Sequence, residues 1–143
     1  MKDRSRADEV PTTRVNRVPR LTIGLPVYNG EVHLSEAFES LLGQTYEDFE
    51  LIVSDNASTD GTSEICLRYA RQDRRIRYIR QDENIGLVPN HVFLIGQARG
   101  ELFKSAAHDD FYARDLLLRC VQTLDDDPSA VVAHPWSAVV DAE

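Results

Sequence analysis

The chain has 143 residues, 42% of them hydrophobic, which is enough for one buried core in a single globular unit. Its formal net charge of −8 and pI near 5.0 argue against a protein held to nucleic acid by a basic surface. No apolar run approaches the roughly eighteen residues that span a bilayer. Two well-separated cysteines, Cys66 and Cys120, predict buried free thiols and a cytoplasmic location.

The first twenty residues differ in charge from the rest of the chain. They carry six basic and three acidic side chains and lack the apolar core of a signal peptide. We predict a flexible, basic lead-in over 1–20, with contact to an anionic membrane surface as the alternative. The globular domain is then expected over 21–143.

The first half of the chain alternates strand and helix patterns. An apolar run from Leu21, "LTIGLPVYNG", is closed by turn residues and predicts a strand. Apolar residues at helical spacing between Leu34 and Leu42 then predict a helix with Glu31 in its first turn and Gly43 near its end. A continuous apolar run at 51–53 predicts the second strand. The helix expected after it has its apolar positions at Ile65, Cys66 and Tyr69.

The second half repeats the alternation. The run "RIRYIRQ" predicts a strand over 76–80, and residues 102–107 predict a fourth. Between them we expect a helix with Pro89 in its first turn, carrying Val92, Phe93 and Ile95. A further helix ends before Pro128 and has its inward positions at Leu116, Leu117, Cys120, Val121 and Leu124. The run "AVVAHPW", residues 130–136, predicts a fifth strand, and residues 138–140 a sixth element.

Strands that alternate with helices of this length form a mostly parallel sheet covered on both faces. Ligands bind such α/β sheets at the carboxyl ends of the strands. The polar residues expected at these ends are Asn29, Asp55, Asn56, Asn84, Asp109 and Asp110. The topology therefore predicts a polar crevice before any motif is considered.

Two common nucleotide-binding motifs are missing from the sequence. The first strand-to-helix turn, "GLPVYNGEV", lacks the G-x-G-x-x-G pattern of dinucleotide-binding folds. No G-x-x-x-x-G-K-[ST] phosphate loop occurs either. The sequence therefore supports neither a nicotinamide-dependent dehydrogenase nor a P-loop NTPase.

An ordered series of motifs carries a resemblance to a known family. The series is P-V-Y-N, then S-D-N-x-S-x-D-G-T, then N-x-G, and then "HDD". Over about Leu21 to Asp127 the chain resembles the amino-terminal part of a family 2 glycosyltransferase. The resemblance implies the GT-A fold, a three-layer α/β/α sandwich. It also implies transfer of a sugar from a nucleotide diphosphate, with a UDP-sugar expected, to an acceptor hydroxyl with the help of Mg²⁺ or Mn²⁺.

The resemblance places the metal at the "HDD" turn. Asp109 matches the second acidic position of the family's D-x-D motif and Ala107 its first, with Asp110 as a neighbouring ligand. A hard cation at such carboxylates stabilises the charge that develops on the departing diphosphate. Two alternatives stay open: Asp109 and Asp110 as N-caps of the following helix, and His108 either as a further ligand or as a group that orients the loop.

The resemblance also assigns the donor pocket. Pro26, Tyr28 and Glu31 would line its base and ribose end, and Asp55 would accept a hydrogen bond from a uracil-like base. The alternatives are a packing aromatic for Tyr28 and a turn residue bonding its own backbone for Asp55.

Two further assignments concern the edge of the donor pocket. Asn84 and Gly86 would shape the loop that covers the nucleotide, with Gly86 at a positive φ. Lys104 would either neutralise phosphate or reach solvent at a sheet edge.

The resemblance leaves the acceptor side open. The family's catalytic base is a carboxylate in the acceptor half, and the sequence ends at Glu143 before any matching segment. We therefore expect a truncated donor-binding domain without a nominated base, and leave open whether the chain is active alone. The alternative is a non-catalytic module that binds nucleotide or a protein partner, or that self-associates through an exposed sheet edge near Val139 and Val140.

Overall fold

A computed structural model describes residues 17–139 of the chain. Its elements are β1 (Leu21–Val27), α1 (Leu34–Leu42), β2 (Phe49–Asp55), α2 (Thr62–Gln72), β3 (Ile76–Arg80), α3 (Leu87–Gln97), β4 (Leu102–Ser105) and α4 (Leu116–Asp126). None of the helices in this range is long and apolar enough to cross a bilayer.

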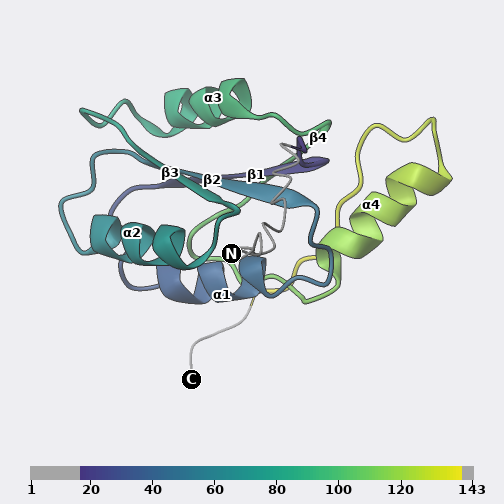
Figure 1. The fold of residues 1–143 in the computed structure, drawn as a ribbon, viewed down its shortest axis with the longest axis horizontal. Coiled ribbons are helices and arrows are strands. Elements are labelled where there is room, and N and C mark those ends of the chain that lie inside the picture. Colours follow the sequence, from purple (N-terminus) through teal and green to yellow (C-terminus); the bar gives the residue numbers. More distant parts are fainter. Residues whose placement is uncertain (1–16, 140–143) are drawn as a thin grey trace, which may run out of the picture.

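The four strands form one parallel sheet in the order β3-β2-β1-β4. Helix α3 covers one face of the sheet, and α1 and α2 cover the other (Figure 1). This arrangement confirms the predicted α/β architecture of three layers. Helix α4 lies beside the sandwich (Figure 1). Asp125 on this helix pairs with Arg20, just before β1.

The core lies on the face of the sheet that α1 and α2 cover (Figure 1). Every residue of β1 and β2 is buried, because these central strands have a neighbour on each side and helices on both faces. Helix α1 adds Leu34, Phe38 and Leu41, all fully buried. The ring of Phe38 stacks on that of Tyr69 from α2, with 4.5 Å between ring centroids.

Helix α3 buries only part of its apolar surface. The core-facing residues are Asn90 and Leu94, whereas Val92 and Ile95 are 62% and 55% exposed. The predicted helix with Pro89 in its first turn is confirmed, and its buried face is set by packing. Apolar residues occur all round this helix, so their spacing does not define one face, and the packing on β1 and β2 decides it instead.

The predicted fifth strand is wrong. Residues 128–139 contain no strand or helix, and Val131, Val132 and Trp136 are exposed. An apolar run becomes a strand only when a neighbouring strand supplies hydrogen bonds, and no described strand pairs with this run. The fourth strand also ends two residues earlier than expected, at Ser105.

The structure leaves the expected self-association untested. Val139 lies in the irregular segment and is exposed, while Val140 lies outside the described residues. Association through this region therefore stays a prediction.

Only the end of the basic lead-in is described, because residues 1–16 lie outside the described range. Residues 17–20 form no helix or strand. Arg17 binds Asp48 at 2.6 Å, and Arg20 pairs with Asp125. Ion pairs therefore hold residues 17 and 20 to the domain, while the proposed flexibility of the rest stays a prediction.

Both cysteines are free thiols, as expected. Cys66 is fully buried, and burial raises the pKa of its thiol to about 12. Cys120 is only partly buried, so the prediction of two buried thiols holds for Cys66 alone.

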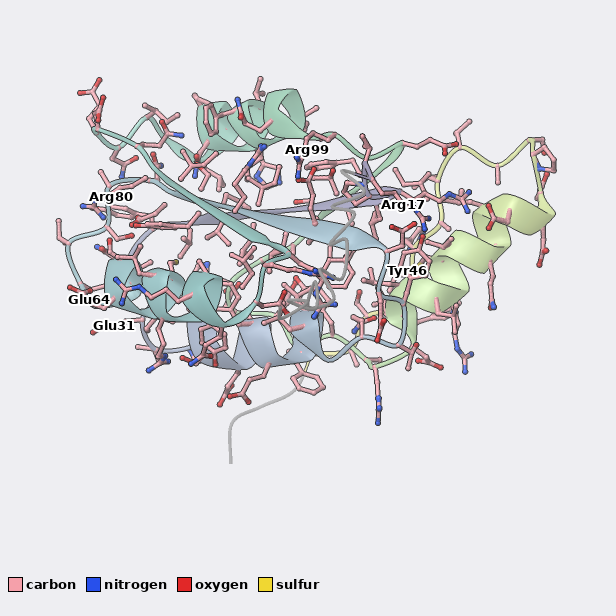
Figure 2. The ribbon with its side chains drawn as sticks, viewed as in Figure 1. Arg17, Glu31, Tyr46, Glu64, Arg80 and Arg99 are labelled. Atoms are coloured by element: carbon pink, nitrogen blue, oxygen red, sulfur yellow. The ribbon has the colours of Figure 1, made fainter. Side chains whose placement is uncertain are left out.

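A buried carboxylate attaches the α3–β4 turn to the centre of the sheet. Glu50 on β2 is 3% exposed and accepts hydrogen bonds from Thr22 Oγ1 at 2.8 Å and Arg99 Nε at 2.9 Å. Burial raises the pKa of Glu50, but the hydrogen bonds from Arg99 and Thr22 outweigh burial and hold it below its ordinary value of 4.5. Arg99 lies on the α3 side of the sheet (Figure 2).

We predict that Glu50→Gln lowers the free energy of unfolding by about 1–2 kcal/mol at pH 7. Because the folded-state pKa is lowered, the contribution of Glu50 is present above pH 4.5 and is lost as the pH falls below it. Urea unfolding at pH 7 and pH 3 should therefore show a difference between wild type and Glu50→Gln that narrows in acid.

Glu101→Gln is the matched control, because the Glu101 side chain is 75% exposed and lies 3.8 Å from Arg20. It should change stability by less than about 0.5 kcal/mol at either pH. If the loss of stability in Glu50→Gln were the same at pH 7 and pH 3, the stabilising role given to the ionised Glu50 carboxylate would be contradicted.

Candidate functional site

The candidate site lies where the strand order reverses. From β1 the chain adds β2 and β3 on one side, then crosses over through α3 and adds β4 on the other side. In open parallel sheets ligands bind at this point, beyond the carboxyl ends of the strands. A cleft of about 290 Å³ lies there, lined by Pro26, Val27, Tyr28, Asn56, Asn84, Leu87, Asn90 and His108.

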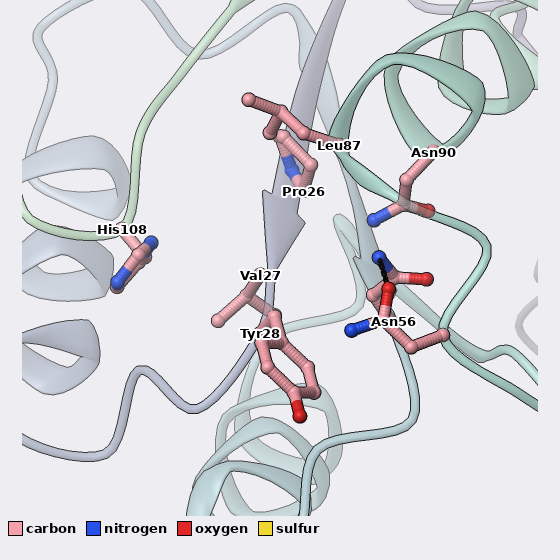
Figure 3. Close-up of a pocket in the computed structure, with 8 residues that line it drawn as sticks. Pro26, Val27, Tyr28, Asn56, Leu87, Asn90 and His108 are labelled. Carbon is pink, nitrogen blue, oxygen red and sulfur yellow. Dashed lines mark hydrogen bonds between the residues drawn. The ribbon is translucent and has the colours of Figure 1, made fainter.

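Figure 3 shows how the walls of the cleft are arranged. The end of β1, with Pro26 and Tyr28, lies between His108 on one side and the amides of Asn56 and Asn90 on the other. Tyr28 is 45% exposed, so its ring has accessible surface for a ligand. None of the described residues that line the cleft is Asp, Glu, Lys or Arg.

Asn56 connects the end of β2 to the loop before α3. Its Nδ2 donates to Asn84 Oδ1 at 2.8 Å, and its Oδ1 accepts from Ile85 N at 2.9 Å. Gly86 N also donates to Asn84 Oδ1, at 2.9 Å. Gly86 has φ 87°, as predicted, which a residue with a Cβ rarely adopts. The loop over one side of the cleft is thus held by side-chain amides.

Asn90 forms a second amide contact at the cleft. It is 1% exposed, and its Oδ1 accepts from Ser54 Oγ at 2.5 Å while its Nδ2 donates to Ser54 O at 3.0 Å. Gln81 Nε2 donates to Ser54 Oγ at 3.0 Å. Asn90 was not among the predicted site residues. Its spacing of four residues from Leu94 was the signal that could have placed it on the buried face of α3.

Asp55 is completely buried at the end of β2. Its carboxylate accepts hydrogen bonds from Ser58 N, Ser63 Oγ and Tyr78 OH, each at 2.8 Å. Arg80 Nη1 lies 2.7 Å from it, in an ion pair. Burial raises the pKa of Asp55, but these hydrogen bonds outweigh burial and lower it below its ordinary value. Internal donors thus occupy the Asp55 carboxylate, and its contact with a nucleotide base stays a prediction.

Hydrogen bonds join the loop after β1 to the loop after β2. Thr59 N donates to Asn29 Oδ1 at 2.8 Å, and Gly61 N donates to Glu31 Oε2 at 2.7 Å. Asn29 has φ 50°, a conformation that Asn tolerates better than most residues. Glu31 thus binds the start of α2 and does not line the cleft. Glu31 and Arg80 lie at one end of the sandwich, opposite Arg17 and Tyr46 (Figure 2).

The acidic pair Asp109 and Asp110 follows His108 on an irregular turn, and both residues are exposed. Helix α4 begins at Leu116 with Asp115 at its N-cap position, so the alternative that Asp109 and Asp110 cap this helix is wrong. Between residues 17 and 139, no group of three or more His, Cys, Asp or Glu side chains could hold a metal. The turn offers a cation two carboxylate side chains, those of Asp109 and Asp110.

The Tyr112 hydroxyl contacts this turn, and Lys104 packs on the Tyr112 ring. Tyr112 is 7% exposed, and burial raises its pKa to about 12, so its hydroxyl keeps its proton at neutral pH. Lys104 Nζ lies 4.9 Å from the centre of the Tyr112 ring, and burial lowers the pKa of Lys104. Lys104 is therefore packed on an aromatic ring at the sheet edge.

Comparison with known proteins identifies the family. The family model described as glycosyl transferase family 2 matches residues 22–141. The chain belongs to glycosyltransferase family 2. This finding and the parallel sheet confirm the resemblance stated from the motifs.

Two curated relatives show how much of a family 2 protein the chain represents. Glycosyltransferase GlyG of Streptococcus pneumoniae is 30% identical over 112 residues, covering 78% of this chain and 37% of that protein. Chondroitin synthase of Escherichia coli is 28% identical over 137 residues, covering 95% of this chain and 20% of that protein. The chain thus spans less than two fifths of either relative.

Solved family structures carry the same fold. Mannosyltransferase PcManGT from Pyrobaculum calidifontis, in complex with GDP-Man and Mn²⁺, matches with a TM-score of 0.71 and 28% identity over 80% of this chain and 34% of that chain. Staphylococcus aureus TarS 1–349, in complex with UDP-GlcNAc, matches with a TM-score of 0.69 and 27% identity over 75% of this chain and 31% of that chain.

The family 2 fold brings the predicted site residues to one end of the sheet but not into one surface. Those that line the cleft are Pro26, Tyr28 and Asn84. Those in the hydrogen-bonded turns around it are Glu31, Asp55 and Gly86. Asp109 and Asp110 follow His108, which lines the cleft. Asn56, which the topology placed at the crevice, also lines the cleft, whereas Val27, Leu87 and Asn90 line it without having been predicted there.

We predict that Gly30→Ala displaces His108 from the cleft. A Cβ at residue 30 would lie 2.6 Å from His108 Cδ2 and 2.7 Å from Val27 Cγ2, both too close for carbon atoms. The free energy of unfolding should fall by about 1–3 kcal/mol. The NMR signals of the His108 ring should shift as it moves.

Gly96→Ala is the control, because nothing lies within 4 Å of a Cβ at this position in α3. It should raise stability by about 0.5–1 kcal/mol and leave the His108 signals in place. Unchanged His108 signals in Gly30→Ala would contradict the close packing of the His108 ring against Gly30.

Proposed function

We propose that this family 2 domain binds a nucleotide-diphosphate sugar, with a UDP-sugar as the expected donor, together with Mg²⁺ or Mn²⁺. In the protein that carries the domain, the sugar is then transferred to an acceptor hydroxyl. The observation that carries the proposal is a neutral cleft at the reversal of strand order, with an exposed carboxylate pair on the turn that begins at its edge.

The neutral cleft suits the uncharged parts of a nucleotide. Its amide groups can donate to and accept from base edges, and the Tyr28 ring offers an aromatic surface. We assign the base and ribose to the part of the cleft lined by Pro26, Tyr28 and Asn84. Glu31 follows the same strand end as Tyr28 and binds Gly61 N in the β2–α2 loop. Gly86 and Asn84 shape the covering loop.

We assign Asp55 a positioning role. Its carboxylate is occupied by donors from the turn, α2 and β3, so a direct contact with the base would require it to release one of them. Neutralising a buried carboxylate that is paired in this way leaves its donors unsatisfied. Substitution of Asp55 would therefore disturb the loops that form the cleft.

The charge distribution supports a divalent cation at Asp109 and Asp110. A diphosphate close to this pair would be repelled by two carboxylates unless a cation lay between them. Mg²⁺ and Mn²⁺ accept carboxylate oxygens, and one or two carboxylates plus substrate phosphates suffice for Mg²⁺. The donor set of Asp109 and Asp110 therefore fits such an ion. When bound, the cation offsets the negative charge left on the nucleoside diphosphate.

Two further observations support the proposed ligand class and location. The Mn²⁺ and nucleotide sugars held by PcManGT and TarS support a similar ligand class for this domain. The free thiols of Cys66 and Cys120 support a reducing, cytoplasmic compartment as the proposed location.

We predict that calorimetric titration of UDP detects binding in the presence of Mn²⁺ and that EDTA weakens it. Asp109→Asn should weaken Mn²⁺-dependent UDP binding by about tenfold or more, because a neutral amide is a poorer ligand for a hard cation. A parallel titration with GDP tests the preference for uracil.

Asp126→Asn is the charge-matched control, because Asp126 is an exposed carboxylate at the end of α4. It should bind UDP and Mn²⁺ as wild type does. Binding by Asp109→Asn at wild-type strength would overturn the metal assignment, and no binding of either nucleotide by wild type would overturn the proposed function.

A further inference from the structure

We infer that Tyr112 is a positioning residue for the acidic pair: its hydroxyl closes the turn of residues 107–112 and so orients Asp109 and Asp110 beside the cleft. The inference rests on the proposed function for the identity of the bound ion. Its structural part, the closure of the turn by a side chain, stands on the contacts of the turn alone.

Regular structure does not hold the acidic pair in place. Strand β4 ends at Ser105 and α4 begins at Leu116, so the pair lies in an irregular connection between them. On the strand side, Ala106 N donates to Gly24 O at 2.9 Å, which continues the pairing with β1. On the helix side, Gln44 Nε2 donates to Ala113 O at 2.7 Å. These contacts fix the two ends of the connection but not its middle.

The hydrogen bonds described within the middle of this connection all involve the Tyr112 hydroxyl. It accepts from Ala107 N at 2.7 Å. It also lies 3.2 Å from Ala107 O and 3.4 Å from Asp110 Oδ2, and its single proton can serve one of these acceptors at a time. The phenol therefore connects the residue before His108 to the second carboxylate of the pair.

The ring of Tyr112 gives this hydroxyl a fixed position. It belongs to the buried core cluster together with Ala106 and Leu117, and Lys104 Nζ lies 4.9 Å from its ring centre. A hydroxyl on a packed ring can hold a short loop in one conformation, as a preformed metal site requires. Without it, the turn would have to order itself when the ion binds, and that ordering would weaken binding.

The alternative is that Tyr112 only fills the core. Tyr112→Phe separates the two roles, because phenylalanine keeps the ring and removes the hydroxyl. If the ring alone matters, the variant should bind Mn²⁺ as wild type does. If the hydroxyl orients the acidic pair, the affinity for Mn²⁺ should fall while the fold is kept.

The first experiment measures Mn²⁺ affinity by electron paramagnetic resonance of the free ion at saturating UDP. We expect Tyr112→Phe to weaken Mn²⁺ binding about tenfold, the size of effect seen when a group supporting a metal ligand is lost. Its circular dichroism spectrum and its affinity for UDP without metal should match those of wild type. Wild-type Mn²⁺ affinity in a folded Tyr112→Phe would overturn the inference.

Tyr69→Phe is the matched control. It removes a hydroxyl that lies 3.4 Å from Ser35 O and 3.3 Å from Glu39 Oε1, on a ring stacked on Phe38 and away from the cleft. Its Mn²⁺ affinity should equal that of wild type. A loss equal to that of Tyr112→Phe would mean that removing any hydroxyl from a packed tyrosine ring has this effect, and would overturn the inference.

A second measurement needs no variant. Amide hydrogen exchange of the wild-type protein should show the Ala107 N–H protected relative to that of Phe111 on the same turn, because only the former donates to Tyr112. Equal and rapid exchange at both positions would overturn the inference.

If wild type binds no Mn²⁺ with UDP, the proposed function fails and the inference fails with it. If only the Tyr112→Phe result is negative, the proposed function stands.

Discussion

The buried carboxylate of Asp55 is the constraint on which this end of the molecule depends. A charge with no exposure is tolerated only when donors surround it, and here they come from the β2–α2 turn, from α2 and from β3. Three separate segments therefore have to meet at one point. Their meeting sets the end of β2, and with it the position of Asn56, which begins the wall of the cleft.

The cleft follows from a series of side-chain bonds between loops. Asn56 holds the loop at Asn84, and Asn29 holds the loop at Thr59, so the strand-end turns support one another. The result is a neutral cavity bordered by a turn whose charges are exposed. The proposed nucleotide-diphosphate ligand rests on this separation, because such a ligand is uncharged at one end and strongly negative at the other.

The sequence was informative wherever structure is encoded locally. The run "RIRYIRQ" predicted β3 with its correct bounds, and the N-x-G motif predicted the positive φ of Gly86. The buried face of α3 could not be read, because a helix that is apolar all round has no preferred face until it packs. The run at 130–136 has the composition of a strand but pairs with no described strand.

The sequence by itself determined the alternation of strands and helices, the family and the place of the polar turns, because spacing and turn chemistry act between residues that are close along the chain. Only the tertiary structure decided that Asn90 lines the cleft, that Glu31 binds the start of α2 and that the Tyr112 hydroxyl accepts a hydrogen bond from Ala107 N in the acidic turn. These roles depend on which groups meet when the sheet forms. A residue's partners across layers are set by packing and by the need to satisfy buried polar atoms, and neither is visible in the local pattern.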